Sequence, residues 1–295
     1  MSNGIARELT IDARGLRYPA VACGDGPVVV LLHGFPDTYR SFDQQLPILA
    51  EAGYRAVSVS MRGYDPGNQP ADRDFSQKEL AADAVAVAEA LASEPVHLVG
   101  HDWGAAVSYT AAAMAPQKFK SLTTMAVPHS GRFLVDMRRH PRQLRLSWYM
   151  GFFQLPAVPE RILRRNDFAF LRWLWRQWSP TWDFSCEDFA PVAECFAQPQ
   201  VVECALAYYR AAVDLPALFG MGRAPAILNV PVPTLAMTGS RDGCISSDVF
   251  EAMSQPKDFP AGLEVKRVDG AGHFLHRERP DVVNAALLAW LAAHA

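Results

Sequence analysis

Short apolar runs alternate along the chain with longer segments in which apolar residues recur every three or four positions. Val28–Leu32 is a run of five aliphatic residues, which is typical of a strand buried on both faces of a sheet. Further strand-like segments occur at 16–22, 55–60, 96–99, 121–127, 234–238 and 263–268, and helical spacing occurs at 40–52, 76–91, 103–115 and 280–291. This alternation predicts an α/β protein with a doubly wound, mostly parallel central sheet flanked by helices. Because segment 16–22 alternates only weakly, we expect an early edge strand or hairpin arm there.

Two helix ends carry local sequence signals. Gly53 follows the helical segment 40–52, where a glycine is a common C-cap. Ser76 precedes the segment 76–91, with Glu79 three residues later, and this spacing predicts a capping box.

The strand–helix alternation stops in the middle of the chain. Between residues 129 and 228 the pattern is helical and rich in aromatic residues, and five of the seven tryptophans of the chain lie there. We therefore expect a core domain formed by residues 1–128 and 229–295, with residues 129–228 inserted as a helical cap. The aromatic enrichment suggests an apolar cavity between cap and core, although such residues also serve simply to pack the cap onto the core.

Composition narrows the possible partners and location. The chain has 295 residues, half of them apolar, and a net charge of −3, which argues against a nucleic acid or an anionic membrane as partner. No apolar run is long enough to span a bilayer, and segment 1–7 has no apolar signal core. The five cysteines show no Cys-x-x-Cys spacing, so we expect no disulfide framework, no zinc site and a cytoplasmic location.

One stretch has the pattern of a nucleophile elbow. The apolar run 96–99 leads into Gly100-His101-Asp102-Trp103-Gly104, and a helix of small residues follows. Such a turn lifts one side chain off the carboxyl end of a strand, where reactive groups of open α/β sheets lie. Here the lifted residue is Asp102 instead of the more common serine.

An aspartate at an elbow predicts a specific chemistry. The side chain of Asp102 is ionised at neutral pH, since an unperturbed aspartate has a pKa of about 3.9, and it needs no base to attack. A carboxylate that attacks saturated carbon forms an alkyl ester. The alternative is that Asp102 only caps the following helix, which the preceding strand and the flanking glycines disfavour.

Turnover of that ester requires an activated water, and two residues are placed to supply it. His273 follows the last predicted strand, and Asp242 follows the strand 234–238, which gives the chain order nucleophile, acid, histidine. Asp242 then orients the imidazole and stabilises its cation. His276 is the alternative base, and a structural turn residue is the alternative for Asp242.

The ester also requires donors for its oxyanion. His33-Gly34-Phe35-Pro36 follows a buried strand, and the backbone N–H groups of Phe35 and Trp103 are candidates to converge on the ester carbonyl oxygen. We interpret His33 as a structural hydrogen-bonding residue and not as a catalyst.

Over essentially its whole length the chain resembles the α/β-hydrolase fold epoxide hydrolases, the relatives of soluble epoxide hydrolase. The segments that carry the resemblance are His33-Gly34-Phe35-Pro36, Gly100-His101-Asp102-Trp103-Gly104, Asp242 and Gly272-His273-Phe274. The resemblance implies an α/β-hydrolase fold with an inserted helical cap. The same segments also fit haloalkane dehalogenases, so only residues of the cap can distinguish the two families.

The resemblance implies two cap tyrosines that hydrogen-bond the epoxide oxygen. The segment Trp148-Tyr149-Met150-Gly151-Phe152-Phe153-Gln154-Leu155-Pro156 nominates Tyr149, and Ala207-Tyr208-Tyr209-Arg210 nominates Tyr209, with Tyr208 as the alternative register. Epoxide opening releases an alkoxide, a much stronger base than halide, so it needs a proton donor such as a phenol. We expect the substrate pocket to be lined by Phe35, Trp103, Trp148, Phe152 and Phe153.

Together these features predict an epoxide hydrolase that converts small apolar epoxides and water to vicinal diols through an aspartyl ester. The resemblance implies no metal and no cofactor, and the chain is expected to be a monomer or homodimer. A haloalkane dehalogenase with the same three residues is the first alternative. A non-catalytic small-molecule receptor is the second, and the joint presence of Asp102, Asp242 and His273 speaks against it.

Overall fold

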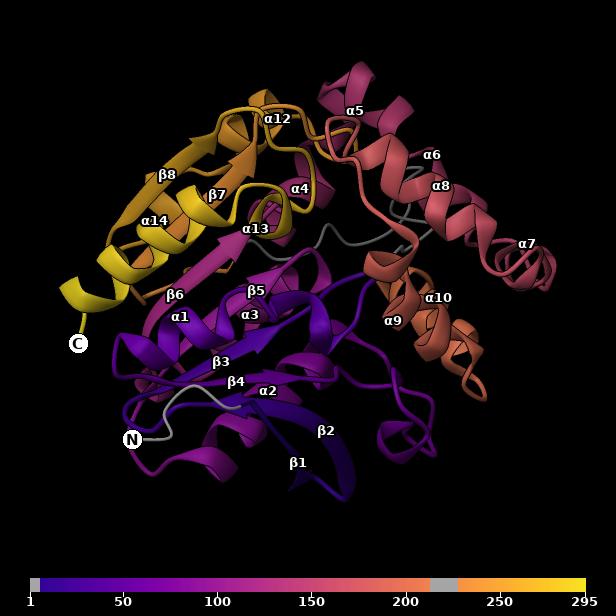
Figure 1. Cartoon of the computed structure of the whole chain (residues 1–295). Coiled ribbons are helices and arrows are strands. Elements are labelled where there is room, and N and C mark those ends of the chain that lie inside the picture. The colour runs from indigo at the N-terminus through magenta and orange to yellow at the C-terminus, as the bar shows by residue number, and fades with distance from the viewer. Residues whose placement is uncertain (1–5, 213–227) are drawn as a thin grey trace.

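Figure 1 shows the computed structural model of the chain, which describes residues 6–212 and 228–295. Eight strands form one sheet in the order β1-β2-β4-β3-β5-β6-β7-β8. In chain order they are β1 (Arg7–Ala13), β2 (Leu16–Cys23), β3 (Val28–Leu32), β4 (Arg55–Val59), β5 (Val96–His101), β6 (Phe119–Met125), β7 (Thr234–Gly239) and β8 (Leu263–Val268). The pairs β1–β2 and β2–β4 are antiparallel and the other neighbours are parallel, so the predicted mostly parallel sheet is confirmed.

Strand β3 shows why a continuous apolar run forms the centre of this sheet. Its alternate residues Val28, Val30 and Leu32 belong to one hydrophobic cluster, and Val29 and Leu31 belong to the cluster on the opposite face. The first face is covered by α2 (Gln77–Leu91) and α3 (Trp103–Met114), and the second by α1 (Leu46–Glu51) and α14 (Pro280–Ala293). Helices on both faces make the sheet doubly wound, as the pattern predicts.

Near the N-terminus the structure contains one strand that the sequence did not predict and divides one predicted helix in two. The strand β1 was not expected, although Leu9, Ile11 and Ala13 alternate with polar residues and face the core; only Ile11 of them is fully buried. Segment 16–22 forms β2, an arm of the β1–β2 hairpin, which confirms the hairpin-arm alternative; the edge strand is β1. The single helix expected at 40–52 is divided into η1 (Tyr39–Phe42) and α1, because Pro47 lacks an N–H and fits only the first turn of a new helix.

The predicted helix ends differ in outcome. Gly53 has φ of 89°, its N–H donates to Ala50 O, and the N–H of Tyr54 donates to Leu49 O, which is a Schellman C-cap as predicted. The predicted capping box is wrong, because the side chain of Ser76 makes no cap hydrogen bond. Instead, the backbone N–H of Ser76 donates to the Asp74 carboxylate.

All regular elements in the described part of the segment between β6 and β7 are helices, joined by turns and loops. It contains α4 (Ser130–Asp136), η4 (Met137–Arg139), α5 (Pro141–Leu146), α6 (Trp148–Phe152), α7 (Val158–Arg164), α8 (Ala169–Trp178), α9 (Cys186–Ala197) and α10 (Val201–Ala212). Figure 1 shows α5–α10 gathered to one side of the sheet. Residues 213–227, the end of the expected cap, lie outside the described residues. The remaining elements are η2 (Pro66–Asn68), η3 (Pro116–Lys118), α12 (Ser247–Met253), η5 (Pro256–Asp258) and α13 (Leu275–Glu278).

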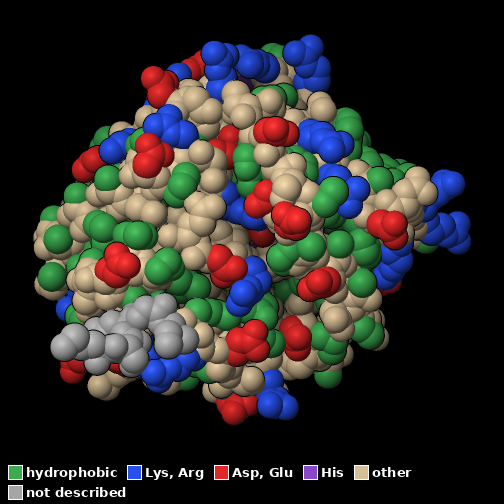
Figure 2. All heavy atoms as spheres, viewed as in Figure 1, with side chains coloured by type: hydrophobic (Ala, Val, Ile, Leu, Met, Phe, Trp, Pro, Cys, Tyr) green, Lys and Arg blue, Asp and Glu red, His purple; other side chains and the backbone are tan. Residues whose placement is uncertain are grey.

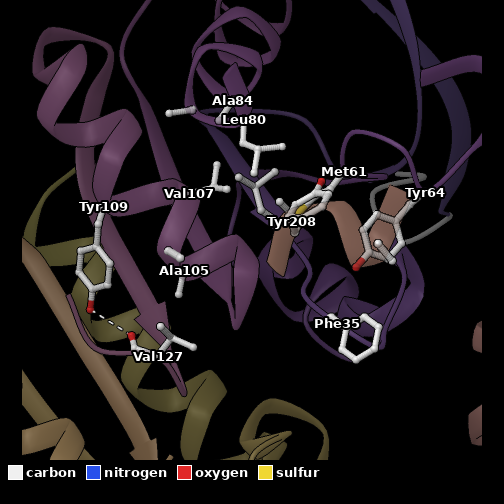
Figure 3. Packing of buried hydrophobic residues seen from close by; sticks show 14 of the residues in the cluster. Phe35, Met61, Tyr64, Leu80, Ala84, Ala105, Val107, Tyr109, Val127 and Tyr208 are labelled. Atoms are coloured by element: carbon white, nitrogen blue, oxygen red, sulfur yellow. Dashed lines mark hydrogen bonds between the residues drawn. The ribbon is translucent and has the colours of Figure 1, made fainter. Parts of the chain in front are cut away.

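Aromatic residues pack these helices onto the sheet. Tyr208 of α10 contacts Tyr64, with ring centroids 5.9 Å apart, and belongs to the same buried cluster as Phe35 and Val107 (Figure 3). The indole N–H of Trp175 donates to Pro36 O at 2.9 Å. These contacts join the helical segment to the loops that follow the carboxyl ends of β3 and β4. None of the described helices combines the length and the apolar composition needed to cross a bilayer.

Candidate active site

The turn after β5 holds Asp102 in a strained backbone conformation. Its φ of 51° and ψ of −116° are unusual for a residue with a Cβ, and such strain is retained where the surrounding structure enforces it. A Cβ on Gly104 would overlap the carbonyl oxygen of Leu32, so only glycine lets helix α3 approach β3 this closely. The side chain of Asp102 makes no helix-cap hydrogen bond, which removes the simple capping interpretation.

The carboxylate of Asp102 points toward the other predicted groups. It is 5% exposed, and its Oδ1 accepts a hydrogen bond of 2.7 Å from the backbone N–H of Phe35. Its Oδ2 lies 3.4 Å from Nε2 of His273. The structure therefore brings one of the two expected oxyanion donors to the carboxylate itself. No hydrogen bond is observed from the N–H of Trp103 among the described residues, although this group starts α3 directly after Asp102.

His273 lies between two carboxylates. Its Nδ1 is 2.9 Å from Oδ2 of Asp242, and the other oxygen of Asp242 accepts the backbone N–H groups of Cys244 and Ile245 at 2.7 and 2.9 Å. Both backbone donors fix the carboxylate, which in turn fixes the imidazole. The predicted set Asp102, His273 and Asp242 is thus brought together with every member buried: His273 is hydrogen bonded to Asp242 and lies within ion-pair distance of Asp102.

The two carboxylates control the charge of His273. Burial alone disfavours the imidazolium, but the negative charges of Asp242 and Asp102 outweigh it and raise the pKa of His273 to about 10. The imidazole is therefore a cation at neutral pH while both carboxylates are ionised. Loss of either charge lowers this pKa.

The other histidines near the site have structural contacts. His276, the alternative base, is hydrogen bonded to Ser41 at 2.7 Å and stacks on Phe42. His33 accepts the N–H of Met61 at 3.1 Å, and burial lowers its pKa to about 4, so it is neutral. His33 is therefore structural, as expected.

Both nominated tyrosines lie across from Asp102. Their rings are 5.8 Å apart, and both side chains line the same cavity as the carboxylate. The hydroxyl of Tyr149 lies 3.2 Å from Sγ of Cys244, and that of Tyr209 has no hydrogen bond of good geometry within the described residues. Burial raises the pKa of both phenols well above its usual value, with Asp102 adding to the effect, so both are protonated donors.

The adjacent Tyr208 points elsewhere. Its hydroxyl donates to Arg62 O at 2.7 Å, and its ring packs in the cluster between α10 and the sheet domain (Figure 3). Because neighbouring residues of a helix project about 100° apart, only one of the two tyrosines of this pair faces Asp102. In the structure that residue is Tyr209.

A cavity of about 460 Å³ opens from Asp102 along helix α3. Besides Asp102 and the two tyrosines, most of the described residues that line it are apolar or aromatic: Trp103, Ala106, Tyr109, Met114, Val127, Phe133, Met150, Ala211, Ala212, Leu228 and Ile245. The remaining lining residues are Gln77, Lys78, Thr110, His129, Ser130 and Gly131. The predicted apolar cavity is present, and Trp103 lines it as expected.

Four of the five expected pocket residues do not line this cavity. Trp148 is 45% exposed on the outer side of α6, and Phe152, one helical turn later, lies on the same side. Tyr149 and Phe153 occupy the inner side, because positions four apart share a helix face. Phe153 and Phe35 are completely buried and pack beneath Tyr209, with ring centroids 5.0 and 5.3 Å from it. Both rings therefore support the side chain of Tyr209 without lining the cavity themselves.

Sequence reasoning missed the residues that connect the catalytic loops to the helical segment. Gln143 of α5 donates to Cys244 O and accepts from the N–H of Ser246. The backbone N–H of His273 donates to Trp178 O at the end of α8 at 3.1 Å. Such contacts depend on segments far apart in the chain, and no local pattern signals them.

Among the described residues, two groups of buried side chains have metal-ligand types: Asp242, Cys244 and His273, and Asp37, His101 and His276. In the first, the histidine and the aspartate are hydrogen bonded to each other. In the second, Ser41 bridges Asp37 and His276, and the guanidinium of Arg277 lies 4.0 Å from Asp37, which opposes a cation. We assign both groups to hydrogen bonding.

Comparison with known proteins agrees with this geometry. Residues 27–280 match the family described as alpha/beta hydrolase fold, which defines the class of the protein. Epoxide hydrolase 3 of Xenopus tropicalis is 31% identical over 94% of this chain and 75% of its own length, and mouse epoxide hydrolase 4 is 29% identical over 94% and 77%. The crystal structure of an epoxide hydrolase from Vigna radiata superimposes with a TM-score of 0.80 at 25% identity, covering 98% of each chain. The chain belongs to the α/β-hydrolase fold epoxide hydrolases, which are hydrolases acting on ether bonds.

Proposed function

We propose that the chain hydrolyses small apolar epoxides to vicinal diols through a covalent ester on Asp102, with residues 129–228 acting as a cap over the reaction centre. The observation that carries the proposal is the pair of buried, protonated phenols, Tyr149 and Tyr209, on the cavity that contains Asp102. An opening epoxide needs such donors, whereas a departing halide does not. The apolar lining of the cavity favours apolar substrates.

In the first step, Asp102 attacks one carbon of the epoxide and the carbon–oxygen bond of the ring breaks. Tyr149 and Tyr209 hold the epoxide oxygen and supply a proton to the alkoxide as it forms. The product is a hydroxyalkyl ester, and the negative charge of Asp102 is lost. The pKa of His273, which that charge helps to raise, then falls, so the imidazolium can return a proton to the phenolate.

In the second step, neutral His273 takes a proton from water, which attacks the ester carbonyl. The backbone N–H groups of Phe35 and Trp103 stabilise the oxyanion, and the bond of Phe35 to the Asp102 carboxylate supports this role. Collapse breaks the ester carbon–oxygen bond, and the second proton of the attacking water passes from the new carboxyl group to the departing alkoxide, which releases the diol and restores ionised Asp102. The first proton of that water remains on His273, so the cycle ends with the imidazolium with which it began.

Substitution of His273 tests the two-step mechanism. In His273→Gln, ring opening should proceed while ester hydrolysis stops, so one equivalent of styrene oxide should remain bound. Intact-protein mass spectrometry should show an increase equal to the mass of the substrate, located by peptide mapping on Asp102. Absence of an adduct on a folded variant that binds substrate would contradict the mechanism.

A parallel assay separates the two enzyme classes that share this triad. Styrene oxide and a bromoalkane of similar size are offered to the native protein, and diol and released bromide are measured. We expect diol formation with little bromide. Bromide release at the higher rate would assign the chain to haloalkane dehalogenases instead.

A further inference from the structure

The outer surface of the helical segment carries an exposed aromatic patch, which we define as Trp148, Phe152, Phe170 and Trp173. Its rings contact one another in a continuous group, with centroid distances from 5.5 to 6.4 Å. The two tryptophans are 45% and 40% exposed. Of the eight most exposed large hydrophobic side chains in the described residues, five lie between positions 144 and 173, so the apolar surface is concentrated here.

The same region is strongly basic. Residues 139–176 contain eight arginines and two acidic residues, Glu160 and Asp167, a difference of six positive charges, whereas the whole chain has a net charge of −3. Figure 2 shows Lys and Arg side chains gathered along the edge of the molecule where Figure 1 places α5 and α7. The net charge of the whole chain, which argues against an anionic membrane partner, therefore does not describe this region, whose surface is positive.

Several of these arginines are available to a partner. Arg142 and Arg145 are exposed on α5, and Arg161 and Arg165 are exposed at α7; within residues 6–212 and 228–295 none of the four has an ion pair. Arg145 is three residues before Trp148, and Arg176 is three residues after Trp173, so positive charge flanks the patch on both sides in sequence.

We propose that this face of the cap docks on an anionic phospholipid surface. Tryptophan side chains favour the boundary between headgroups and acyl chains, and arginines bury their stems there while their guanidinium groups bind phosphate. Such docking is peripheral, since the aromatic side chains enter only the interfacial layer. A second copy of the chain is the less favoured occupant, because two such faces would bring like charges together. The proposal does not depend on the proposed reaction.

Vesicle binding by the native chain tests the proposal. Flotation is measured with vesicles of phosphatidylcholine alone and with vesicles that also contain phosphatidylglycerol, at low and high ionic strength. We expect binding to the anionic vesicles that weakens with salt, and little binding to the neutral ones. No binding to anionic vesicles at low ionic strength, or equal binding to both, overturns the proposal.

Two variants locate the surface. Trp173→Ala should weaken the partition coefficient roughly tenfold, the value of one buried large side chain, and Arg142→Glu with Arg145→Glu should abolish anionic selectivity. Arg17→Glu with Lys257→Glu makes the same change of charge at exposed positions of the sheet domain and should bind like the native protein. All are compared at matched circular dichroism and thermal midpoint. If the cap variants bind as well as the control, the proposal is wrong.

Sedimentation velocity on the same proteins identifies the other occupant. We expect no change in association state between the native chain and Trp173→Ala. A dimer that Trp173→Ala dissociates would assign the patch to a second copy of the chain and overturn the membrane proposal.

Discussion

The two halves of the site differ in how their reactive groups are held. On the sheet side, Asp102 accepts from Phe35 N–H, and Asp242 accepts two backbone N–H groups in addition to its contact with His273. On the cap side, the hydroxyl of Tyr149 meets only a thiol, and that of Tyr209 makes no good hydrogen bond among the described residues. The two carboxylates are thus fixed by backbone donors, whereas neither phenol hydroxyl is fixed by the backbone of the described residues.

This difference matches what the proposed mechanism requires of each half. Attack and ester hydrolysis need groups fixed before the substrate arrives, because misplacement by about an ångström is costly. The tyrosines have to donate to an oxygen that only the substrate brings, so a strong resident partner would compete with it. Leaving a buried hydroxyl without a partner costs about 1–3 kcal/mol, and substrate binding recovers this cost.

Removal of the nucleophile should have the largest effect on the sheet side. In Asp102→Ala, no ester can form, and the rate of diol formation should fall by roughly 10⁶-fold, as for other covalent catalysts. The variant should also show no substrate adduct by mass spectrometry when combined with His273→Gln. Residual diol formation at more than a small fraction of the native rate would show that water attacks the epoxide directly.

The cap side offers a matched pair of adjacent tyrosines. Tyr209→Phe should slow ring opening by roughly 10²–10⁴-fold, the usual range for an acid catalyst, without loss of stability, because its hydroxyl makes no good bond in the folded protein. Tyr208→Phe should leave ring opening nearly unchanged but destabilise the fold by about 1–3 kcal/mol, since it leaves Arg62 O without its donor. Single-turnover kinetics and urea unfolding measure the two effects.

The opposite result would identify Tyr208, and not Tyr209, as the second ring-opening tyrosine. If Tyr208→Phe loses ring opening and Tyr209→Phe only loses stability, the alternative register applies. If both variants open the ring at the native rate, the tyrosines take no part in the reaction. That result would favour a halide leaving group, as in haloalkane dehalogenases.

The sheet side of the site could be predicted because its signals are local in the sequence. The run Val28–Leu32 identifies a strand that is buried on both faces, and Gly100 and Gly104 identify the turn that lifts Asp102. His273 and Asp242 follow from their positions after strands, since parallel strands bring their carboxyl ends to one edge. Strand β1 was not predicted: Leu9, Ile11 and Ala13 alternate with polar residues, but the segment is largely exposed and only Ile11 is fully buried, so its apolar signal is weak.

The cap side could be predicted less well. Its helices are short and aromatic on both sides, so the sequence nominated Trp148 and Phe152 for the pocket while the helix turns them outward. Which side faces the cavity is decided by packing against distant segments. The contacts of Gln143 and Trp178 with the loops of Asp242 and His273 have the same origin.

The raised pKa of His273 predicts a pH dependence of stability. The folded protein retains the imidazolium proton of His273 up to a pH of about 10, and the unfolded chain releases it near 6.5. The stabilisation of the folded state by protonated His273 is therefore complete below about pH 6.5. Between these values the native state binds one more proton, and this stabilisation is lost as pH rises through about 10. In urea titrations, the free energy of unfolding of the native protein should therefore fall toward that of His273→Gln as the pH rises. A constant difference would show that His273 is neutral in the free protein.

The smallest effect is expected at Cys244, where the two halves meet. Its backbone N–H fixes Asp242 and its thiol contacts Tyr149, so only the second contact is removed in Cys244→Ala. A thiol is a weak hydrogen-bonding group, and we expect ring opening to change by about threefold or less. Ester hydrolysis, measured from the decay of the trapped intermediate, should not change because the backbone bond to Asp242 remains.

Cys244→Ser places a stronger partner beside Tyr149 and should slow ring opening more than alanine does, because the tyrosine then has to leave a better hydrogen bond to reach the substrate. Equal slowing of both steps in both variants would show that Cys244 supports the whole loop and does not act through Tyr149.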